Sequence, residues 1–348
     1  MNIWEKRKVL VTGGASFIGS HLVDALVKRG ARVRVVDNLS VGLLENIQGH
    51  VDSGKIEFRK EDLLEQEVAR RAAKGQEITF HLAADHGGRG YIATHPVECS
   101  TNLILDGTVF RACHQEGVGK VVFASSGCVY PTSMQMDPKE LVYLSEDMVG
   151  PPYESDDIYG WAKLMAEMTL KAYHTQHGMK TASCRFFTVY GPRCGESHAV
   201  MAMIARAFVR QDPFVVWGTG EQIRNWTYVD DIVEGMILAG EKIDDGTAVN
   251  LGTTERIRVM DCAQEVIRLA GYEAKIVKRT DMPSGVLNRT ADTALAKRLL
   301  GRVPQMSFKD GLKKTYDWYI STKDRAQVEK LVSDEQSLLK HQVVASAK

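Results

Sequence analysis

The feature that most constrains the fold is a short apolar run followed at once by a glycine-rich turn near the start of the chain. Lys8–Val11 (KVLV) is typical of a buried strand, and Thr12–Gly19 (TGGASFIG) leads from it into the amphipathic segment Ser20–Lys28. Strand, glycine turn and helix in this order indicate a dinucleotide-binding unit, in which Gly13 permits the tight turn and Gly19 permits close packing of helix on sheet. Backbone N–H groups at the start of such a helix bind pyrophosphate. An ordinary strand-to-helix turn is the alternative.

The second strand ends in an acidic residue about twenty residues after the glycine turn, where a dinucleotide-binding unit needs one. Arg32–Val36 leads into Asp37 and Asn38, and a carboxylate there accepts hydrogen bonds from the adenosine ribose. Because this charge repels a 2′-phosphate, NAD is favoured over NADP, although Arg34 and Arg59 leave NADP open.

Two further strands extend the pattern. Ile56–Phe58 is followed by Asp62 and Leu63, with Asp62 a candidate for the adenine amino group or, equally, for the cap of a helix. Ile78–Leu82 breaks into the loop Ala83–Tyr91, whose alanines and glycines let the backbone approach a ligand. In that loop His86 and Arg89 either touch substrate or are solvated.

The nine residues Phe123–Pro131 (FASSGCVYP) end the next strand, which begins with Lys120–Val122. Open α/β sheets bind ligands outside the carboxyl ends of their strands. We therefore expect Ser125, Ser126 and Cys128 to face a ligand. A space-filling role is the alternative for Cys128.

The long helix predicted over Asp157–His177 carries Tyr159 and Lys163 one turn apart on the same face. The ammonium can lower the pKa of the phenol, which then accepts a hydroxyl proton while a nicotinamide takes the hydride.

The strand–helix alternation loosens near residue 190, where we predict a change of domain. The prediction is a NAD-binding domain of residues 1–190, a substrate-binding lobe of residues 191–320 with partly interleaved helices, and a polar C-terminal tail of residues 321–348. In the lobe, Arg224 and Arg289 are predicted to bind a diphosphate. Surface salt bridges are the alternative, which for Arg289 would involve Asp292.

Composition excludes several classes of partner. Lys plus Arg equals Asp plus Glu at 44 each, so overall charge favours neither nucleic acid nor an anionic membrane. No apolar segment is long enough to span a bilayer. The six cysteines are scattered without the spacing of a metal site or a disulfide scaffold. We expect a cytoplasmic protein without a metal.

The motifs TGGASFIG, SSGCVYP, YGWAK and FFTVYGPR, with Asp37 between the first two, together resemble the extended short-chain dehydrogenase/reductase family that modifies nucleotide sugars. The resemblance implies an α/β fold: a Rossmann doubly wound parallel sheet with a smaller C-terminal α/β substrate lobe. It also implies NAD as cofactor, a nucleotide-diphosphate sugar as substrate, and a homodimer formed through Asn102–Gln115 and Asp157–His177.

Residues Gly127 and Cys128 separate subfamilies. Sugar 4,6-dehydratases usually carry Asp-Glu there, and 4-epimerases an inert Thr or Ala at the second position. A Cys at the second position, as in Cys128, is similar to the pattern of GDP-mannose 3,5-epimerases and GDP-fucose synthases. In those enzymes a basic residue of the substrate lobe acts on the opposite face of the sugar. His198 falls at that place here, with a surface role as the alternative. A thiol and an imidazole titrate close enough to neutral pH for each to act as acid or base.

The predicted function is therefore a NAD-dependent nucleotide-sugar epimerase that oxidises C4 transiently and inverts C3 or C5, with a GDP-mannose-type substrate. A UDP- or GDP-sugar 4-epimerase, a C4 dehydrogenase and a non-catalytic NAD-binding regulator are the alternatives. The predicted catalytic residues are Ser126, Cys128, Tyr159, Lys163 and His198. The predicted cofactor-binding residues are Gly13, Ser16, Phe17, Ile18, Gly19, Asp37, Asn38, Asp62, Leu63, Leu82, Ala83, Ala84, Tyr159 and Lys163. The predicted substrate-binding residues are Gly88, Arg89, Ser126, Thr188, Arg224 and Arg289. Ser16 and Thr188 depart from the family pattern, which usually has Gly and Asn.

Overall fold

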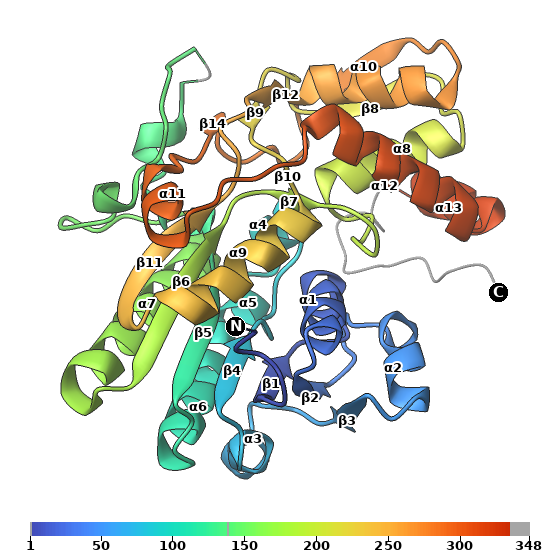
Figure 1. Ribbon diagram of the computed structural model, residues 1–348. Coiled ribbons are helices and arrows are strands. Elements are labelled where there is room, and N and C mark those ends of the chain that lie inside the picture. Colours follow the sequence, from blue (N-terminus) through green and yellow to red (C-terminus); the bar gives the residue numbers. More distant parts are fainter. Residues whose placement is uncertain (1, 138, 335–348) are drawn as a thin grey trace.

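A seven-stranded parallel sheet forms the centre of the computed structural model, which describes residues 2–137 and 139–334. Its strand order is β11-β6-β5-β4-β1-β2-β3 (Figure 1). The strands are β1 (Lys8–Thr12), β2 (Arg32–Asp37), β3 (Ile56–Lys60), β4 (Ile78–His81), β5 (Lys120–Ser126), β6 (Lys180–Phe186) and β11 (Asp245–Leu251). Val9, Val11 and Phe80 are fully buried, as expected for a parallel sheet covered on both faces. The predicted Rossmann doubly wound fold is confirmed.

Helices cover both faces of this sheet. Helices α1 (Phe17–Lys28) and α9 (Val229–Lys242) pack together on one face, and α3 (Gln66–Ala73), α6 (Asn102–Gln115) and α7 (Asp157–His177) cover the other. The strand order reverses between β1 and β4, so the loops that follow these strands diverge and leave room for a ligand. The remaining short helices of this part are η1 (Leu44–Asn46), α2 (Gln48–Asp52), α4 (Arg89–Thr94), α5 (Pro96–Ser100), η2 (Gly127–Val129), η3 (Ser133–Gln135) and η4 (Glu146–Met148).

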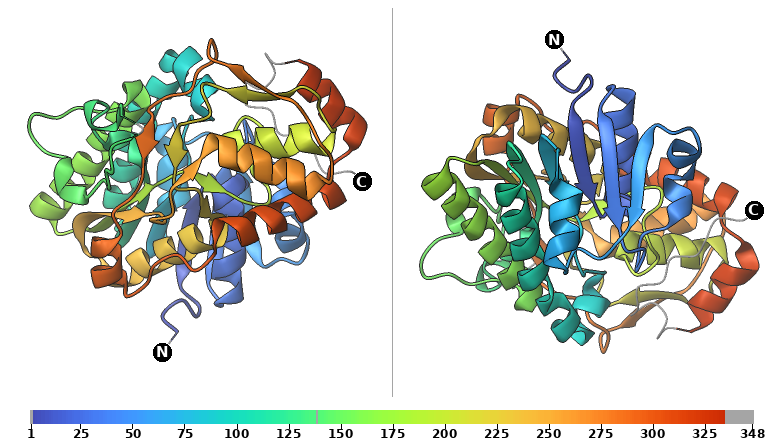
Figure 2. Two further views of the ribbon diagram at one scale, coloured as in Figure 1. Left: turned by 90° about the horizontal axis from the view of Figure 1, so that it is seen from above. Right: turned by 90° about the horizontal axis from the view of Figure 1, so that it is seen from below.

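A smaller α/β lobe lies over the carboxyl ends of the strands (Figures 1 and 2). It contains the parallel pair β8 and β13 and the small sheet β12-β9-β14, while β7 pairs with β10 beside it. The elements are β7 (Val189–Tyr190), α8 (Ala199–Phe208), β8 (Phe214–Trp217), β9 (Ile223–Arg224), β10 (Thr227–Tyr228), β12 (Ile257–Arg258), α10 (Val259–Ala270), β13 (Ile276–Arg279), β14 (Asn288–Arg289), α11 (Ala294–Leu300), α12 (Phe308–Thr322) and α13 (Arg325–Ser333).

The chain does not pass from one part to the other only once. After the first helix of the lobe it returns to the large sheet through α9 and β11, and β11 pairs with β6. The division at residue 190 stays a prediction. Any such division must allow for α9 and β11, which follow residue 190 in the chain but pack with the large sheet. The predicted tail begins inside the packed structure, because Val328 of α13 is fully buried against the core. Residues 335–348 of that tail lie outside the described residues.

The described residues contain neither a membrane-spanning helix nor a metal cluster. None of the helices in residues 2–137 and 139–334 is long and apolar enough to cross a membrane. Within the same ranges, no group of three or more His, Cys, Asp or Glu side chains is arranged to hold a metal ion.

Candidate active site

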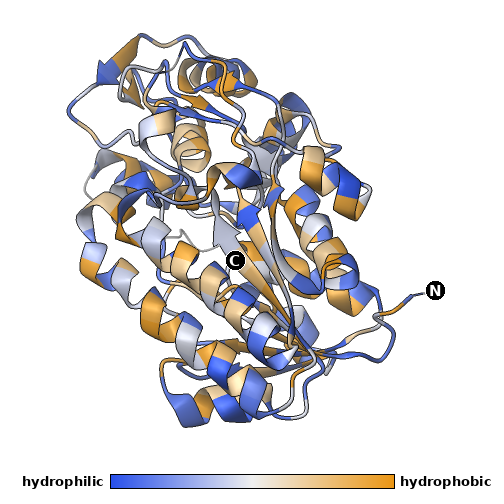
Figure 3. Cartoon of the chain, turned by 90° about the vertical axis from the view of Figure 1, so that its left-hand side faces the viewer, coloured by the Kyte–Doolittle hydropathy of each residue, from blue (hydrophilic) through white to orange (hydrophobic). Residues whose placement is uncertain are grey.

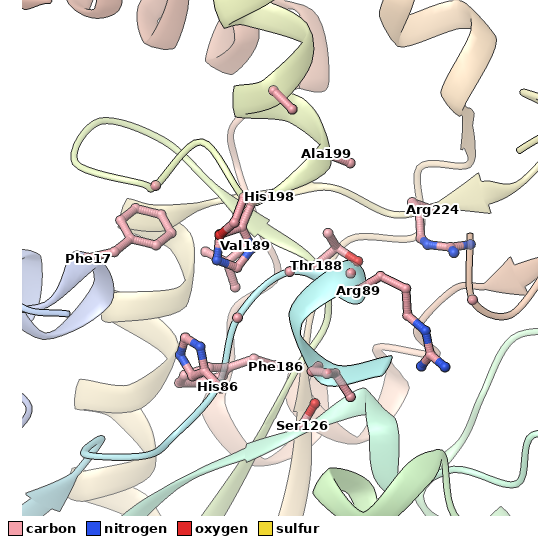
Figure 4. A pocket seen from close by; sticks show the side chains of 18 of the residues that line it. Phe17, His86, Arg89, Ser126, Phe186, Thr188, Val189, His198, Ala199 and Arg224 are labelled. Atoms are coloured by element: carbon pink, nitrogen blue, oxygen red, sulfur yellow. The ribbon is translucent and has the colours of Figure 1, made fainter. Parts of the chain in front are cut away.

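A cavity of about 340 Å³ lies between the carboxyl ends of the sheet strands and the smaller lobe. Figure 4 shows side chains from both parts around it. The predicted site residues that line it are Ser16, Phe17, Ile18, Leu82, Ala84, Gly88, Arg89, Ser126, Cys128, Tyr159, Lys163, Thr188, His198, Arg224 and Arg289. The predicted residues outside its lining are Gly13, Gly19, Asp37, Asn38, Asp62, Leu63 and Ala83.

The glycine turn brings the start of α1 very close to β1 and β4. Gly13 has a φ of +69°, and a Cβ there would lie 2.8 Å from the Ala83 nitrogen. A Cβ on Gly19 would lie 2.1 Å from the Gly13 carbonyl oxygen. The Ser16 hydroxyl donates to the same oxygen at 2.5 Å, so the side chain that departs from the family pattern folds back onto the turn. Only glycine fits at Gly13 and Gly19, as a pyrophosphate cradle requires.

Asp37 closes this turn from the end of β2. Its carboxylate accepts hydrogen bonds from the backbone N–H groups of Ala15 (3.0 Å) and Leu39 (2.9 Å). Burial raises the pKa of Asp37 and these two bonds oppose the shift. Nearby, the Asn38 amide donates to Asp62 at 3.4 Å.

Arg34 and Arg59 are the two arginines that could have favoured NADP by binding its 2′-phosphate. Both donate hydrogen bonds to Glu57. Arg34 donates to Glu57 at 2.8 Å and also to backbone carbonyls at the end of α3, including that of Ala72. Arg59 donates to the other carboxylate oxygen of Glu57 at 2.8 Å. Their guanidinium groups therefore already have an anionic partner.

The two serines at the end of β5 have different surroundings, as neighbouring residues of a strand do. Ser125 donates to Glu167 at 2.5 Å, and Glu167 is held in turn by Arg185 at 2.8 Å. Ser125 lines the cavity, although its hydroxyl is engaged by Glu167, and its contact with a ligand stays a prediction. Ser126 lines the cavity, and its hydroxyl accepts from the Cys128 N–H at 3.1 Å.

Tyr159 and Lys163 lie on the same face of α7, as predicted. The Lys163 ammonium lies 5.8 Å from the centre of the Tyr159 ring and 4.5 Å from that of Phe123. Burial raises the pKa of Tyr159, and nearby Cys128 adds to this, while a hydrogen bond with Ser126 lowers it. Burial lowers the pKa of Lys163, because it disfavours the charged ammonium. We expected Lys163 to depress the Tyr159 pKa, but burial outweighs any such effect here.

Cys128 lies against a guanidinium group. Arg289 donates through one terminal nitrogen to the Cys128 sulfur at 3.2 Å, through the other to Asp156 at 2.7 Å, and through Nε to Gln135 at 2.7 Å. Burial opposes the charge of Arg289, but Cys128 and Asp156 outweigh it and its pKa is raised. Its ion-pair partner is Asp156, whereas the Asp292 carboxylate accepts a hydrogen bond from the backbone N–H of Ala294, the first residue of α11.

Arg224 and Arg89 place further positive charge at the cavity. Arg224 donates to the backbone carbonyls of Ile223 and Ser284. Burial lowers the pKa of Arg224 to about 9, and repulsion from Arg289 and Arg89 contributes, with Asp156 opposing. Arg89 is held by Asp156 at 2.9 Å and by Asp157 at 2.6 Å.

Comparison with known proteins identifies the family. A sequence profile of the NAD dependent epimerase/dehydratase family matches residues 9–252. This chain belongs to that family.

Its relatives within the epimerase/dehydratase family act on different sugars. GDP-mannose 3,5-epimerase 1 of Oryza sativa subsp. japonica is 32% identical over 320 residues, 90% of this chain and 82% of that protein. The structure of UDP-glucose 4-epimerase from Thermotoga maritima with UDP-glucose is 31% identical, with a TM-score of 0.80 over 90% of this chain and 98% of that one. The UDP-glucose 4-epimerase of Thermus thermophilus, solved with NAD, is 28% identical, with a TM-score of 0.77 over 89% and 98%.

Sequence reasoning passed over two residues that matter to the geometry of this family member. Asp156 joins Arg89 to Arg289, and the signal for it was readable, since it immediately precedes a predicted helix that carries Tyr159. Gln135 comes from an irregular segment with no pattern that points to the site. The sequence left His86 open between a substrate contact and a solvated loop residue; it lines the cavity, and its ring centroid lies 6.3 Å from that of Tyr159.

Proposed function

We propose that this protein is a NAD-dependent nucleotide-sugar epimerase that oxidises the sugar transiently at C4 and inverts C5, C3 or both. The observation that carries the proposal is that Cys128 and His198, two side chains able to exchange carbon protons, line the same cavity as Ser126, Tyr159 and Lys163. A site for oxidation and a site for inversion would thus serve one bound sugar.

The proposed cofactor residues are those of the glycine turn and the neighbouring strand ends. The Gly13 and Gly19 cradle fits a pyrophosphate, and Asp37 lies where a ribose acceptor is needed. Because Arg34 and Arg59 are both engaged by Glu57, they favour NAD rather than NADP. The Thermus relative, solved with NAD, agrees with this choice. The remaining proposed cofactor residues are Ser16, Phe17, Ile18, Asn38, Asp62, Leu63, Leu82, Ala83, Ala84, Tyr159 and Lys163.

In the oxidation half of the proposal, Tyr159 accepts the proton of the C4 hydroxyl. Ser126 assists, since its hydrogen bond lowers the pKa of the phenol. Lys163 contributes a buried positive charge beside the same ring. NAD, when bound, supplies the hydride acceptor and returns the hydride at the end of the cycle.

In the inversion half, Cys128 and His198 exchange protons with the carbons next to the C4 ketone. A ketone acidifies these C–H bonds, and inversion needs an acid on one face and a base on the other. Arg289 stabilises negative charge on the Cys128 sulfur, which it contacts at 3.2 Å. Gly127 lacks the acid that a 4,6-dehydratase carries at that position, which argues against dehydration.

The substrate is proposed to be a nucleotide-diphosphate sugar of the GDP-mannose type. Arg224 is buried beside Arg89 and Arg289, and mutual repulsion contributes to its pKa of about 9. A diphosphate would supply the missing negative charge at this end of the cavity. Gly88 and Thr188 line the same cavity and are proposed to contact substrate. The rice relative, a GDP-mannose 3,5-epimerase, favours GDP-mannose.

Solvent deuterium tests this function. The purified protein is incubated with candidate GDP- and UDP-sugars in deuterium oxide, and the recovered sugars are examined by NMR and mass spectrometry. We expect deuterium at C5 or C3 of the recovered sugar. Turnover without deuterium at either carbon would overturn the proposal.

A sugar 4-epimerase is the second candidate, because the Thermotoga structure with UDP-glucose matches this chain at a TM-score of 0.80. A 4-epimerase would invert C4 of a UDP- or GDP-sugar without deuterium at C3 or C5. A C4 dehydrogenase would instead accumulate the reduced cofactor and the keto sugar.

A homodimer through α6 and α7 is the proposed assembly. Large apolar side chains are exposed on this side of the molecule, among them Val97 (73%) of α5, Ile104 (61%) of α6, and Trp161 (38%) and Met165 (47%) of α7. Figure 3 faces this side. An exposed apolar face of this kind is typical of a subunit interface. Sedimentation of the purified protein would test it.

A cytoplasmic location, with neither nucleic acid nor membrane as partner, also stays a prediction. All six cysteines are buried and free of disulfides in the structure, which supports a reducing compartment.

A further inference from the structure

His86 lies between the two proposed reaction centres. Its ring centroid is 6.3 Å from that of Tyr159 and 6.3 Å from that of His198, and the ring planes meet at 84° and 83°. These are edge-to-face contacts. Figure 4 shows His86 on the loop after β4 and His198 at the start of α8. One imidazole thus contacts a side chain assigned to oxidation and a side chain assigned to inversion.

The backbone fixes this arrangement. A Cβ on Gly88 would lie 1.9 Å from the Ser197 carbonyl oxygen, so the loop that carries His86 touches the turn that carries His198. The His198 N–H donates to the Gly195 carbonyl at 3.2 Å, which holds the other side of the contact. The proximity of the two imidazoles is therefore built into the packing of the loop on the lobe.

The surroundings favour neutral imidazoles. Burial lowers the pKa of His86, and the Lys163 ammonium of α7 lowers it further, with Asp85 of its own loop opposing. Burial lowers the pKa of His198 to about 4, and His86 contributes to the shift. Near neutral pH each ring therefore has a nitrogen that can accept a proton.

Building on the proposed function, we propose that His86 is a positioning residue for inversion: it holds His198 as the base and receives the proton that His198 takes from the sugar. This role fixes the direction of proton transfer in the inversion step, with His198 as the base and Cys128 as the acid.

The proton balance of the step is complete. The C–H bond next to the C4 ketone breaks, its electron pair forms the enolate, and the proton binds His198. That proton passes to His86 and then to solvent in the cavity. On the opposite face the Cys128 thiol gives its proton to the same carbon, and a new C–H bond forms. Arg289 stabilises the thiolate until solvent returns a proton to it.

The test is a His86→Phe variant, which keeps an aromatic ring against Tyr159 and His198 but removes both ring nitrogens. We expect deuterium incorporation at the inverted carbon to fall about a hundredfold, with KM unchanged. We also expect the acid limb of its pH profile to move to higher pH, because the pKa of His198 rises once His86 no longer lowers it. A merely structural role would not move this limb.

Two further variants secure the result. His86→Gln keeps hydrogen bonding but cannot carry the proton, so we expect a loss of about tenfold or more in incorporation. It also decides the matter if His86→Phe does not fold. His95→Phe is the control, since His95 stacks on Tyr91 at 4.3 Å outside the cavity lining. It should exchange at the wild-type rate.

The outcomes separate this inference from the proposed function. If the wild type incorporates deuterium and the folded His86 variants match it in rate and pH profile, the role of His86 is overturned and the epimerase stands. If the wild type turns over nucleotide sugars without incorporation, the proposed function fails and the inference fails with it.

Discussion

The two ends of the cavity differ in whether backbone or side chains form them. The proposed cofactor end is centred on backbone: a continuous strand–turn–helix segment in which Gly13 and Gly19 leave no room for a Cβ. The proposed sugar end consists of side chains from distant parts of the chain, and Cys128 and Arg289 are 161 residues apart. The first end depends on shape and the second on charge. Single substitutions should therefore damage them in different ways.

The largest expected effect tests whether the two ends act independently. Cys128→Ser replaces the thiol with a much weaker acid of similar shape, so we expect deuterium incorporation to fall about a thousandfold, or about 4 kcal/mol in activation free energy. NAD affinity, measured by calorimetry, should not change. A parallel loss of NAD affinity would contradict the separation of the ends.

The next effect concerns the backbone cradle. Gly19→Ala forces the Gly13 carbonyl away from a Cβ that would sit 2.1 Å from it. We expect a loss of about 3 kcal/mol in the free energy of unfolding, measured with urea, and weaker NAD binding.

Gly49 of α2 provides the control for this variant, because a Cβ there meets nothing within 4 Å. Gly49→Ala should keep or slightly raise stability. An equal loss in both variants would show that crowding at Gly19 is not the cause.

Asp156→Asn tests the charge network at the sugar end. The variant leaves Arg89 and Arg289 without their shared carboxylate, so we expect a loss of about 2 kcal/mol in unfolding free energy, discounted for the partial exposure of Arg89. A nucleoside diphosphate should restore more stability to the variant than to the wild type in thermal denaturation, because it supplies the missing charge.

The same network makes a pH prediction. Burial raises the pKa of Asp156, but Arg289 and Arg89 outweigh burial and the pKa is lowered from its ordinary 3.8. The folded carboxylate thus binds its proton less readily than the unfolded one. Its stabilisation is present above pH 3.8 and is lost as the pH falls through the lowered value. Acid denaturation curves of wild type and Asp156→Asn should therefore converge at low pH.

The smallest expected effect concerns Ser16, in the glycine turn between Gly13 and Gly19. Ser16→Gly removes a hydroxyl that donates to the Gly13 carbonyl and restores the family pattern. We expect a change of about 0.5 kcal/mol or less in unfolding free energy, and a similarly small change in NAD affinity by calorimetry. A large gain in affinity would mean that the serine obstructs the cofactor.

The cofactor end could be predicted from the sequence because its signal is local. The spacing of Gly13, Gly19 and Asp37 follows from one turn and one helix, and the structure has the strands and helix expected around it. The bounds of α6 and α7 also match the predicted helices, and each helix is followed within two residues by a glycine of positive φ, Gly117 and Gly178.

The sugar end was less predictable because its contacts are long-range. Arg289 was predicted to bind a diphosphate, which stays a prediction, and its partners in the structure are Cys128 and Asp156 rather than Asp292. Nothing local to β14 indicates those partners. The bond between the Ser125 hydroxyl and Glu167 was not predictable either, because residue type alone does not reveal it.

The return of the chain to the large sheet through β11 has a consequence for biosynthesis. β6 pairs with β11, so the edge of the sheet stays open until Leu251 has been synthesised. An open strand edge in a nascent chain is a template for pairing with other chains. Translation that pauses between β6 and β11 should therefore promote aggregation more than a pause after β11.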